Sequence, residues 1–203
     1  MKKFIVIVGF LAFVGFRNFG KVEKPLVLQQ VELEMPFIAT QILDMEASSQ
    51  QHIVHTRLPE SGRLKIVQTV ALYVGGELLD SKEFSMEEIG RDVYFLSLVD
   101  PKFNLSTLGI VVNRPQNAGW SRNVYTGIFE DFFESFDFNG AFMVASLHEP
   151  LEINFDEDVL IGAFLWDNHT ESVVYRLELY EDRELLAPYD AAILVTVNIS
   201  LVE

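Results

Sequence analysis

The clearest pattern along the chain is the alternation of apolar and polar residues over short segments, which is typical of β-strands with one buried face. It is best developed in residues 191–202, where Thr196, Asn198 and Ser200 stand between apolar residues at Ile193, Val195, Val197, Ile199 and Leu201. Both the long run and its regular period predict a strand with one face in the core.

A second alternating segment covers residues 63–74, and its apolar positions are Leu64, Ile66, Val70, Leu72 and Val74. Gly75 and Gly76 follow directly, and a pair of glycines between two strand-like segments indicates a tight hairpin into Glu77. Shorter segments of the same character predict further strands at 26–33, 37–43, 52–57, 92–99, 105–112, 141–147, 159–166 and 172–180. Nine or ten strands at this spacing, without alternating helices, predict an all-β fold: an antiparallel sandwich, barrel or jelly roll. Of these, we favour a jelly-roll-like antiparallel sandwich.

Two segments indicate short helices between the strands. Ser85 and Glu88 have the spacing of a capping box, so one helical turn is expected there. From Ile128 onward, apolar residues recur at intervals of three and four and predict a helix that ends near Asn139, with the apolar stripe Phe129, Phe132, Phe133 and Phe136. We expect the stripe either to join the core or to form a partner surface together with Trp120, which is assigned to a loop at 114–122.

The N-terminal segment differs from the rest of the chain. Lys2 and Lys3 precede an uncharged run, and Arg17 ends it; its apolar members are Phe4, Ile5, Val6, Ile7, Val8, Phe10, Leu11, Phe13, Val14 and Phe16. Such a run resembles a secretion signal, but it lacks small residues at a cleavage site. Two interpretations are favoured equally, a retained membrane-touching arm and a strand or arm packed in the core or on a neighbouring subunit; an uncleaved signal ranks below them. Pro25 places the boundary between an arm at 1–24 and a single domain at 25–203.

Composition narrows the possible partners. The formal net charge is −15, which argues against nucleic acid as the main partner because phosphate binding needs a basic surface. The chain has no cysteine, so disulfides, cysteine nucleophiles and thiolate metal sites are excluded. It has 17 phenylalanines, more aromatic surface than an ordinary domain needs, which favours a thick core or a partner surface.

No motif for catalysis, cofactor binding or phosphate binding is present, and neither an enzymatic role nor a cofactor is expected. His52 and His55 would point to opposite faces of a strand and so could not share a metal ion. The acidic run Asp156, Glu157 and Asp158 is a weak candidate for calcium, with a solvated turn as the favoured alternative. Asn-x-Ser/Thr triplets begin at Asn104, Asn168 and Asn198 and matter only in a glycosylating pathway.

These observations favour a structural role. We expect a subunit of a larger assembly, such as a viral capsid or surface layer, that contacts copies of itself or neighbouring structural proteins. Its N-terminal arm is expected to attach it to a membrane or to a neighbouring subunit. The expected location is a membrane, a virion or a cell surface, with the cytoplasm not excluded. A membrane-tethered or exported carbohydrate-binding module that uses Trp120 is the first alternative, and a jelly-roll enzyme with clustered carboxylates is the second.

Overall fold

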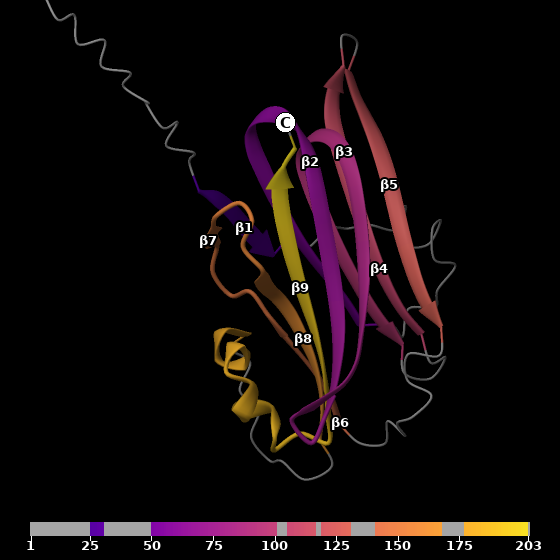
Figure 1. Cartoon of the computed structure of the whole chain (residues 1–203), viewed down its shortest axis with the longest axis vertical. Helices are drawn as coiled ribbons and strands as arrows, with labels where there is room; N and C mark the ends of the chain where they lie inside the picture. Colours follow the sequence, from indigo (N-terminus) through magenta and orange to yellow (C-terminus); the bar gives the residue numbers. More distant parts are fainter. Residues whose placement is uncertain are drawn as a thin grey trace, which may run out of the picture.

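A computed structural model describes residues 25–30, 50–100, 105–116, 119–130, 141–167 and 177–202 of the chain. These residues form nine strands and two short 3-10 helices (Figure 1). The elements are β1 (Leu26–Gln30), β2 (Gln50–Val74), β3 (Glu77–Asp100), β4 (Leu105–Gln116), β5 (Gly119–Glu130), β6 (Ala141–Ser146), β7 (Leu151–Ile153), β8 (Val159–Asp167), η2 (Leu177–Glu181), η3 (Arg183–Leu186) and β9 (Ala191–Leu201).

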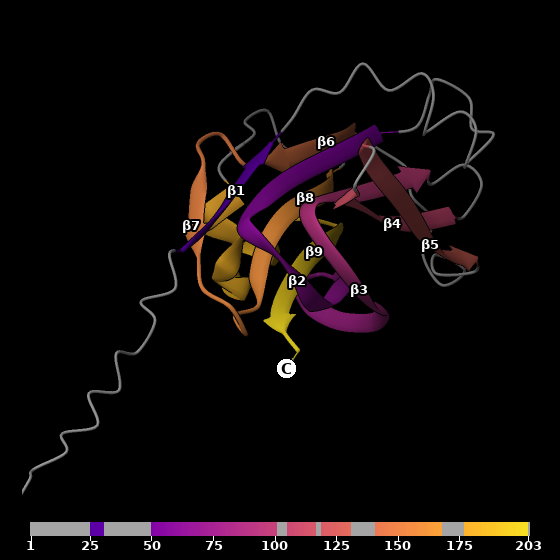
Figure 2. The same ribbon diagram turned by 90° about the horizontal axis from the view of Figure 1, so that it is seen from above.

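All the strands belong to one antiparallel sheet, and the predicted all-β antiparallel class is confirmed. The order along the sheet is β5-β4-β3-β2-β9-β8-β6, while β1 pairs with both β2 and β7. Seen from above, the sheet is strongly curled, so that strands distant in this order come to face each other across the interior (Figure 2).

The curl follows from the length of the β2–β3 hairpin. The first part of β2 pairs with β1, and the second part, from Leu64 to Val74, pairs with β9. Between the two parts the register with β3 shifts at Arg57 and Gly62, and such irregularities bend a strand and increase its twist. A Cβ on Gly62 would lie 3.3 Å from Leu201 Cδ2, so the missing side chain lets β9 lie close beside this bend.

One hydrogen-bonded contact shows that the two halves of the hairpin meet across the interior. Gln68 is paired in register with Phe84, yet its side-chain nitrogen Nε2 donates to the Leu96 carbonyl and to Ser97 Oγ, each at 3.1 Å. Leu96 itself lies in the other half of β3, beside Ile53. Gln68 is fully buried, so these bonds satisfy its amide nitrogen inside the core.

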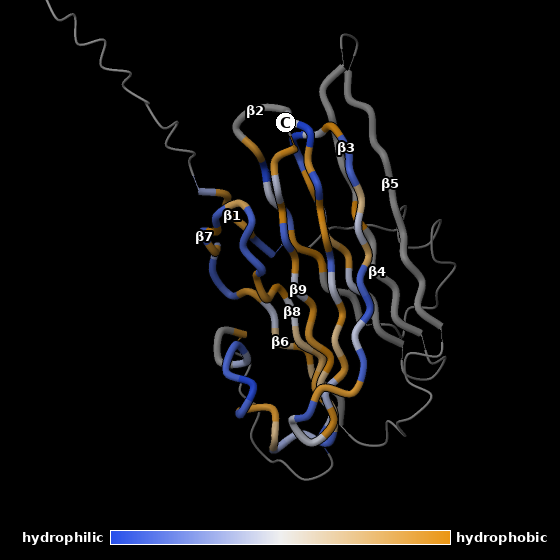
Figure 3. Tube along the Cα trace, viewed as in Figure 1, coloured by the Kyte–Doolittle hydropathy of each residue, from blue (hydrophilic) through white to orange (hydrophobic). Residues whose placement is uncertain are grey.

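The core is built from the two alternating segments that the sequence identifies. Leu64, Ile66, Val70 and Leu72 are all fully buried, and so are their β9 neighbours Ile193, Val195, Val197 and Ile199. Strand β8 is buried on both faces because Leu177, Tyr180, Leu186 and Tyr189, from η2, η3 and the turn after them, join the same core. Apolar residues are accordingly concentrated along β8 and β9 (Figure 3).

Several local predictions are wrong. Residues Ser85–Glu88 lie within β3 rather than in a helical turn, because continuous pairing with β2 on that hairpin outweighs a local capping pattern. Residues Ile128–Glu130 continue β5 and pair with β4, so the predicted helix does not begin at Ile128. Leu177–Glu181 forms a 3-10 helix instead of the end of a strand.

The predicted loop at 114–122 is also wrong in part, since β4 continues to Gln116 and β5 begins at Gly119. Trp120 therefore lies on a strand, opposite Pro115. The predicted strands at 37–43 and the helix residues beyond Glu130 lie outside the described residues. Within the part of the chain that the structure describes, no helix has the length and apolar character needed to cross a bilayer.

Candidate functional site

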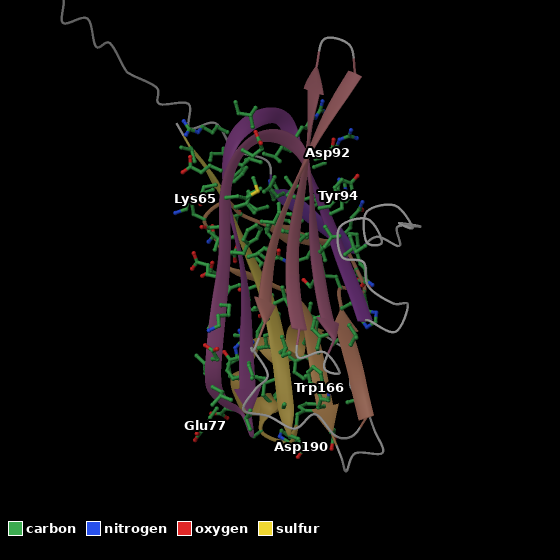
Figure 4. The ribbon with its side chains drawn as sticks, turned by 90° about the vertical axis from the view of Figure 1, so that its right-hand side faces the viewer. Lys65, Glu77, Asp92, Tyr94, Trp166 and Asp190 are labelled. Atoms are coloured by element: carbon green, nitrogen blue, oxygen red, sulfur yellow. The ribbon has the colours of Figure 1, made fainter. Side chains whose placement is uncertain are left out.

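The first candidate site is a group of polar side chains on the outer face of the sheet, and we call it the His55 cluster. It consists of Gln29, His55, Arg57, Asp92 and Tyr94, from β1, β2 and β3. The sheet register places Gln29 and Tyr94 on either side of His55, and Arg57 opposite Asp92. Asp92 and Tyr94 lie near the end of the sheet away from Trp166 and Asp190 (Figure 4).

An ion pair and a stacked ring hold the His55 cluster together. Arg57 Nε lies 2.9 Å from Asp92 Oδ1, and the Asp92 side chain is only 9% exposed. The rings of His55 and Tyr94 are 4.5 Å apart between centroids, with 32° between their planes. Gln29 Nε2 lies 3.5 Å from His55 Nδ1, which is at the limit of hydrogen-bonding distance.

The Nε2 atom of His55 faces the Asp92 carboxylate, which also binds Arg57, but does not form a hydrogen bond with it. It lies 3.5 Å from Asp92 Oδ1, a separation at the limit of hydrogen-bonding distance, and it has no hydrogen-bond partner of good geometry. The contact between His55 and Asp92 is therefore electrostatic. Burial lowers the pKa of His55 below its ordinary value of 6.5, and Arg57 adds to that effect, while Asp92 opposes it. The imidazole is neutral at pH 7.

A neutral histidine beside a carboxylate is also the arrangement of a general base and its orienting group. Here, however, the carboxylate is bound by Arg57, and the free side of the imidazole is covered by Tyr94 and Gln29. Among the described residues, no three His, Asp or Glu side chains are grouped closely enough to hold a metal ion. The contacts of the His55 cluster instead join β1 to β2 and β3.

The second candidate site is a pocket between the β6–β7 connection, β7, β8 and η2, and we call it the acidic pocket. Its volume is about 170 Å³, and it is lined by Leu147, Glu149, Pro150, Leu151, Leu160, Leu177 and Glu181. Leu160 and Leu177 are buried, whereas both glutamates are exposed. The pocket therefore combines apolar walls with two carboxylates, which suits a ligand that is both apolar and cationic.

The residues proposed for calcium have other partners. Glu157 Oε2 accepts hydrogen bonds from the backbone nitrogen of Asn154 at 3.1 Å and from its side-chain nitrogen at 3.2 Å. Asp158 Oδ1 accepts from Asn198 Nδ2 at 2.8 Å, while Asp156 occupies the turn with a φ of 63°. This geometry is that of an acidic turn closed by its own amides, and calcium binding stays a prediction.

Most of the residues expected to contact a membrane or a partner are not placed by the structure. The apolar residues of segment 4–16, together with Phe132, Phe133 and Phe136, lie outside the described residues, as do Asn104 and Asn168. Phe129 is placed on β5 opposite Ser106, and only its backbone is described.

Sequence reasoning missed both sites, for different reasons. The alternation of His55 with the buried Val54 and Thr56 indicates an outward-facing side chain, but the register with β3 is needed to bring Asp92 beside it. The acidic pocket joins residues from 147 to 181 that no local spacing connects. Comparisons with known proteins supply no analogy for either site, because the chain matches no protein-family model, no curated protein and no solved structure.

Proposed function

We propose that this protein is a structural subunit: a β-sandwich-type domain that associates with neighbouring copies through the edge of its sheet, with residues 1–24 as an attachment arm. The observation that carries the proposal is the character of β6, the strand at one end of the sheet order. An unpaired edge strand can add a strand from a neighbouring copy, whereas proteins that remain monomeric protect the edges of their sheets.

The sequence of β6 lacks the charges and prolines that usually protect an edge strand. Its sequence, Ala-Phe-Met-Val-Ala-Ser, contains no charged residue and no proline. It pairs with β8 over six consecutive positions without a register shift, and among the described residues no strand pairs with its other side. A straight, uncharged edge presents a row of backbone donors and acceptors to which another strand can add.

Apolar side chains are exposed at the same end of the molecule as the start of β6. Leu78 and Leu79, at the β2–β3 turn, are 57% and 50% exposed, and Leu185 on η3 is 42% exposed. The turn is joined to this end by hydrogen bonds from Gly75 N to Asp190 O and from Asp190 N to Trp166 O. Figure 4 shows Glu77, Trp166 and Asp190 together there. These apolar side chains extend the surface that a neighbouring copy could cover.

The net charge of −15 opposes contact between copies at low ionic strength. Salt shortens the range of that repulsion to about 10 Å at 0.1 M, so association through an uncharged edge is expected to strengthen as salt is added. A contact held by surface ion pairs would weaken under the same conditions.

The test is the association of the full chain, measured by sedimentation velocity over a range of concentrations and salt. We expect oligomers that increase with both. Ser146→Lys, which places a charge on the β6 edge, should weaken association at least tenfold, or about 1.4 kcal/mol. Ser85→Lys adds the same charge at an exposed position of β3 and is the matched control, with circular dichroism confirming that both variants fold.

Two results would contradict the proposal. The first is a folded, detergent-free monomer at every concentration and ionic strength. The second is equal association of the Ser146→Lys variant and the wild type, which would show that β6 is not the contact.

A further inference from the structure

We infer that the acidic pocket binds the basic and apolar segment 17–24 of a neighbouring copy, so that the copies join head to tail. This inference rests on the proposed function and adds to the β6 edge a second contact between copies, which is ionic and which salt should weaken. It depends on the shape and chemistry of the pocket, on the distribution of charge along the chain, and on the direction in which β1 enters the sheet.

The pocket has the chemistry to receive a lysine or arginine side chain. Leu160 and Leu177 form buried apolar surface, Leu151 is half-buried, and Glu149 and Glu181 are exposed carboxylates. Long basic side chains lay their methylene groups along apolar surface while the charged end stays near water. A volume of about 170 Å³ is sufficient for one side chain, because apolar cavities of about 150 Å³ accept a benzene-sized molecule.

Further acidic residues stand close to the pocket's lining residues in the sequence. Glu152, Asp182 and Glu184 are all exposed close to the lining residues in sequence. Among the described residues near the pocket in sequence, Arg183 is already engaged, because its guanidinium donates to the backbone oxygen of Tyr180. The two carboxylates that line the pocket, Glu149 and Glu181, favour a basic partner and disfavour an acidic one.

The basic partner is present in the same chain. Residues 1–24 contain five Lys and Arg against one Glu, whereas residues 25–203 contain ten against 29 Asp and Glu, giving formal charges of +4 and −19. Within the first part, Arg17, Lys21 and Lys24 alternate with Phe19 and Val22. This segment combines the cationic and apolar groups that the pocket requires.

The register of β1 indicates that the segment comes from another copy. Leu28 pairs with Leu151, which lines the pocket, but the chain enters β1 at Leu26, which pairs with Ile153. Followed back toward its first residue, β1 therefore runs away from the pocket. A contact between one copy's arm and the next copy's pocket is heterologous, and it builds rings or filaments rather than closed dimers.

The experiment measures binding of a labelled synthetic peptide of residues 17–24 to the full-length protein by fluorescence anisotropy. We expect saturable binding that Glu149→Gln combined with Glu181→Gln weakens at least tenfold. Glu77→Gln combined with Glu83→Gln removes the same charge from exposed positions outside the pocket and should leave the affinity within twofold. A second peptide with Lys21→Glu and Lys24→Glu should not bind.

The inference is overturned if the peptide fails to bind at millimolar concentration, or if both double variants weaken binding equally, which would indicate a general charge effect. The outcome is separable from that of the proposed function. If the chain oligomerises through β6 but does not bind the peptide, only the inference about the pocket is refuted. A chain that binds the peptide specifically but stays monomeric refutes the assembly.

Discussion

The tight approach of the β2–β3 turn to the segment after η3 makes Gly76 a sensitive position for stability. A Cβ on Gly76 would lie 3.0 Å from Ala187 Cα, 3.1 Å from Ala187 N and 3.2 Å from Ala187 Cβ. Its φ of 85° also lies in the region that other residues seldom adopt. The substitution Gly76→Ala should therefore be strained both by the backbone and by the contact.

The adjacent glycine separates the two effects. Gly75 has a φ of 57°, but a Cβ there would meet no atom within 4 Å. We expect Gly75→Ala to cost about 0.5–1 kcal/mol, because a left-handed penalty of about 1–2 kcal/mol is partly offset by lower entropy of the unfolded chain. Gly76→Ala adds an overlap with backbone atoms that cannot rotate away, which costs about 1–3 kcal/mol, for a total of about 1.5–4 kcal/mol.

The assay is urea denaturation of the wild type and the two variants, followed by the fluorescence of the buried Trp166 and by circular dichroism. In thermal unfolding, each kcal/mol should lower Tm by about 2–4 °C in a chain of this size. If Gly76→Ala and Gly75→Ala differ by less than about 0.5 kcal/mol, the close contact with Ala187 does not exist in solution, and the reasoning is refuted.

Three further outcomes follow from burial and hydrogen bonding. The pKa of His55 is lower in the folded chain than in the unfolded chain, so the unfolded chain binds more protons as the pH falls below 6.5. The free energy of unfolding should therefore be highest above pH 6.5 and decrease as the pH drops. Urea titrations between pH 5 and 7 should show a flatter pH dependence for His55→Gln than for the wild type. Gln68→Leu should cost about 1–2 kcal/mol because it leaves Ser97 Oγ without its buried donor, and adding Ser97→Ala should recover part of that loss; no recovery would contradict the bond. Phe164→Ala, in the fully buried core, should cost about 3–5 kcal/mol, whereas Ile89→Ala, at a site 50% exposed, should stay within about 0.5 kcal/mol, and similar losses for both would place Phe164 outside the core.

The local predictions that held are those in which burial and backbone geometry agree. In residues 191–202 and 63–74, a period of two can bury its apolar side chains only as a strand, and both segments are strands with a buried face. The hairpin at Gly75 and Gly76 was also predicted correctly, because a pair of glycines accommodates the positive φ values that the turn requires. The predictions that failed, at Ser85, at Ile128 and at Leu177, relied on local spacing in segments whose conformation is decided by their neighbours in space.

In the candidate sites, too, some features follow from local sequence and others depend on the tertiary structure. That His55 and Arg57 share a face follows from their spacing in the sequence, whereas their contact with Asp92 depends on the register of β2 with β3. The acidic pocket could not be predicted at all, since its floor and mouth come from four separate elements that meet only when η2 covers β8.

By itself, the sequence determined that this protein is all-β and which segments form its central strands. It also determined that residues 1–24 are basic and that the rest of the chain is acidic. Side-chain alternation and composition are properties of the chain alone, so they can be read without a fold. The curl of the sheet, the place of β6 at one end of its strand order and the pocket beside η2 were decided only in the tertiary structure. They depend on strand register and on contacts between residues far apart in sequence, and no local pattern encodes them.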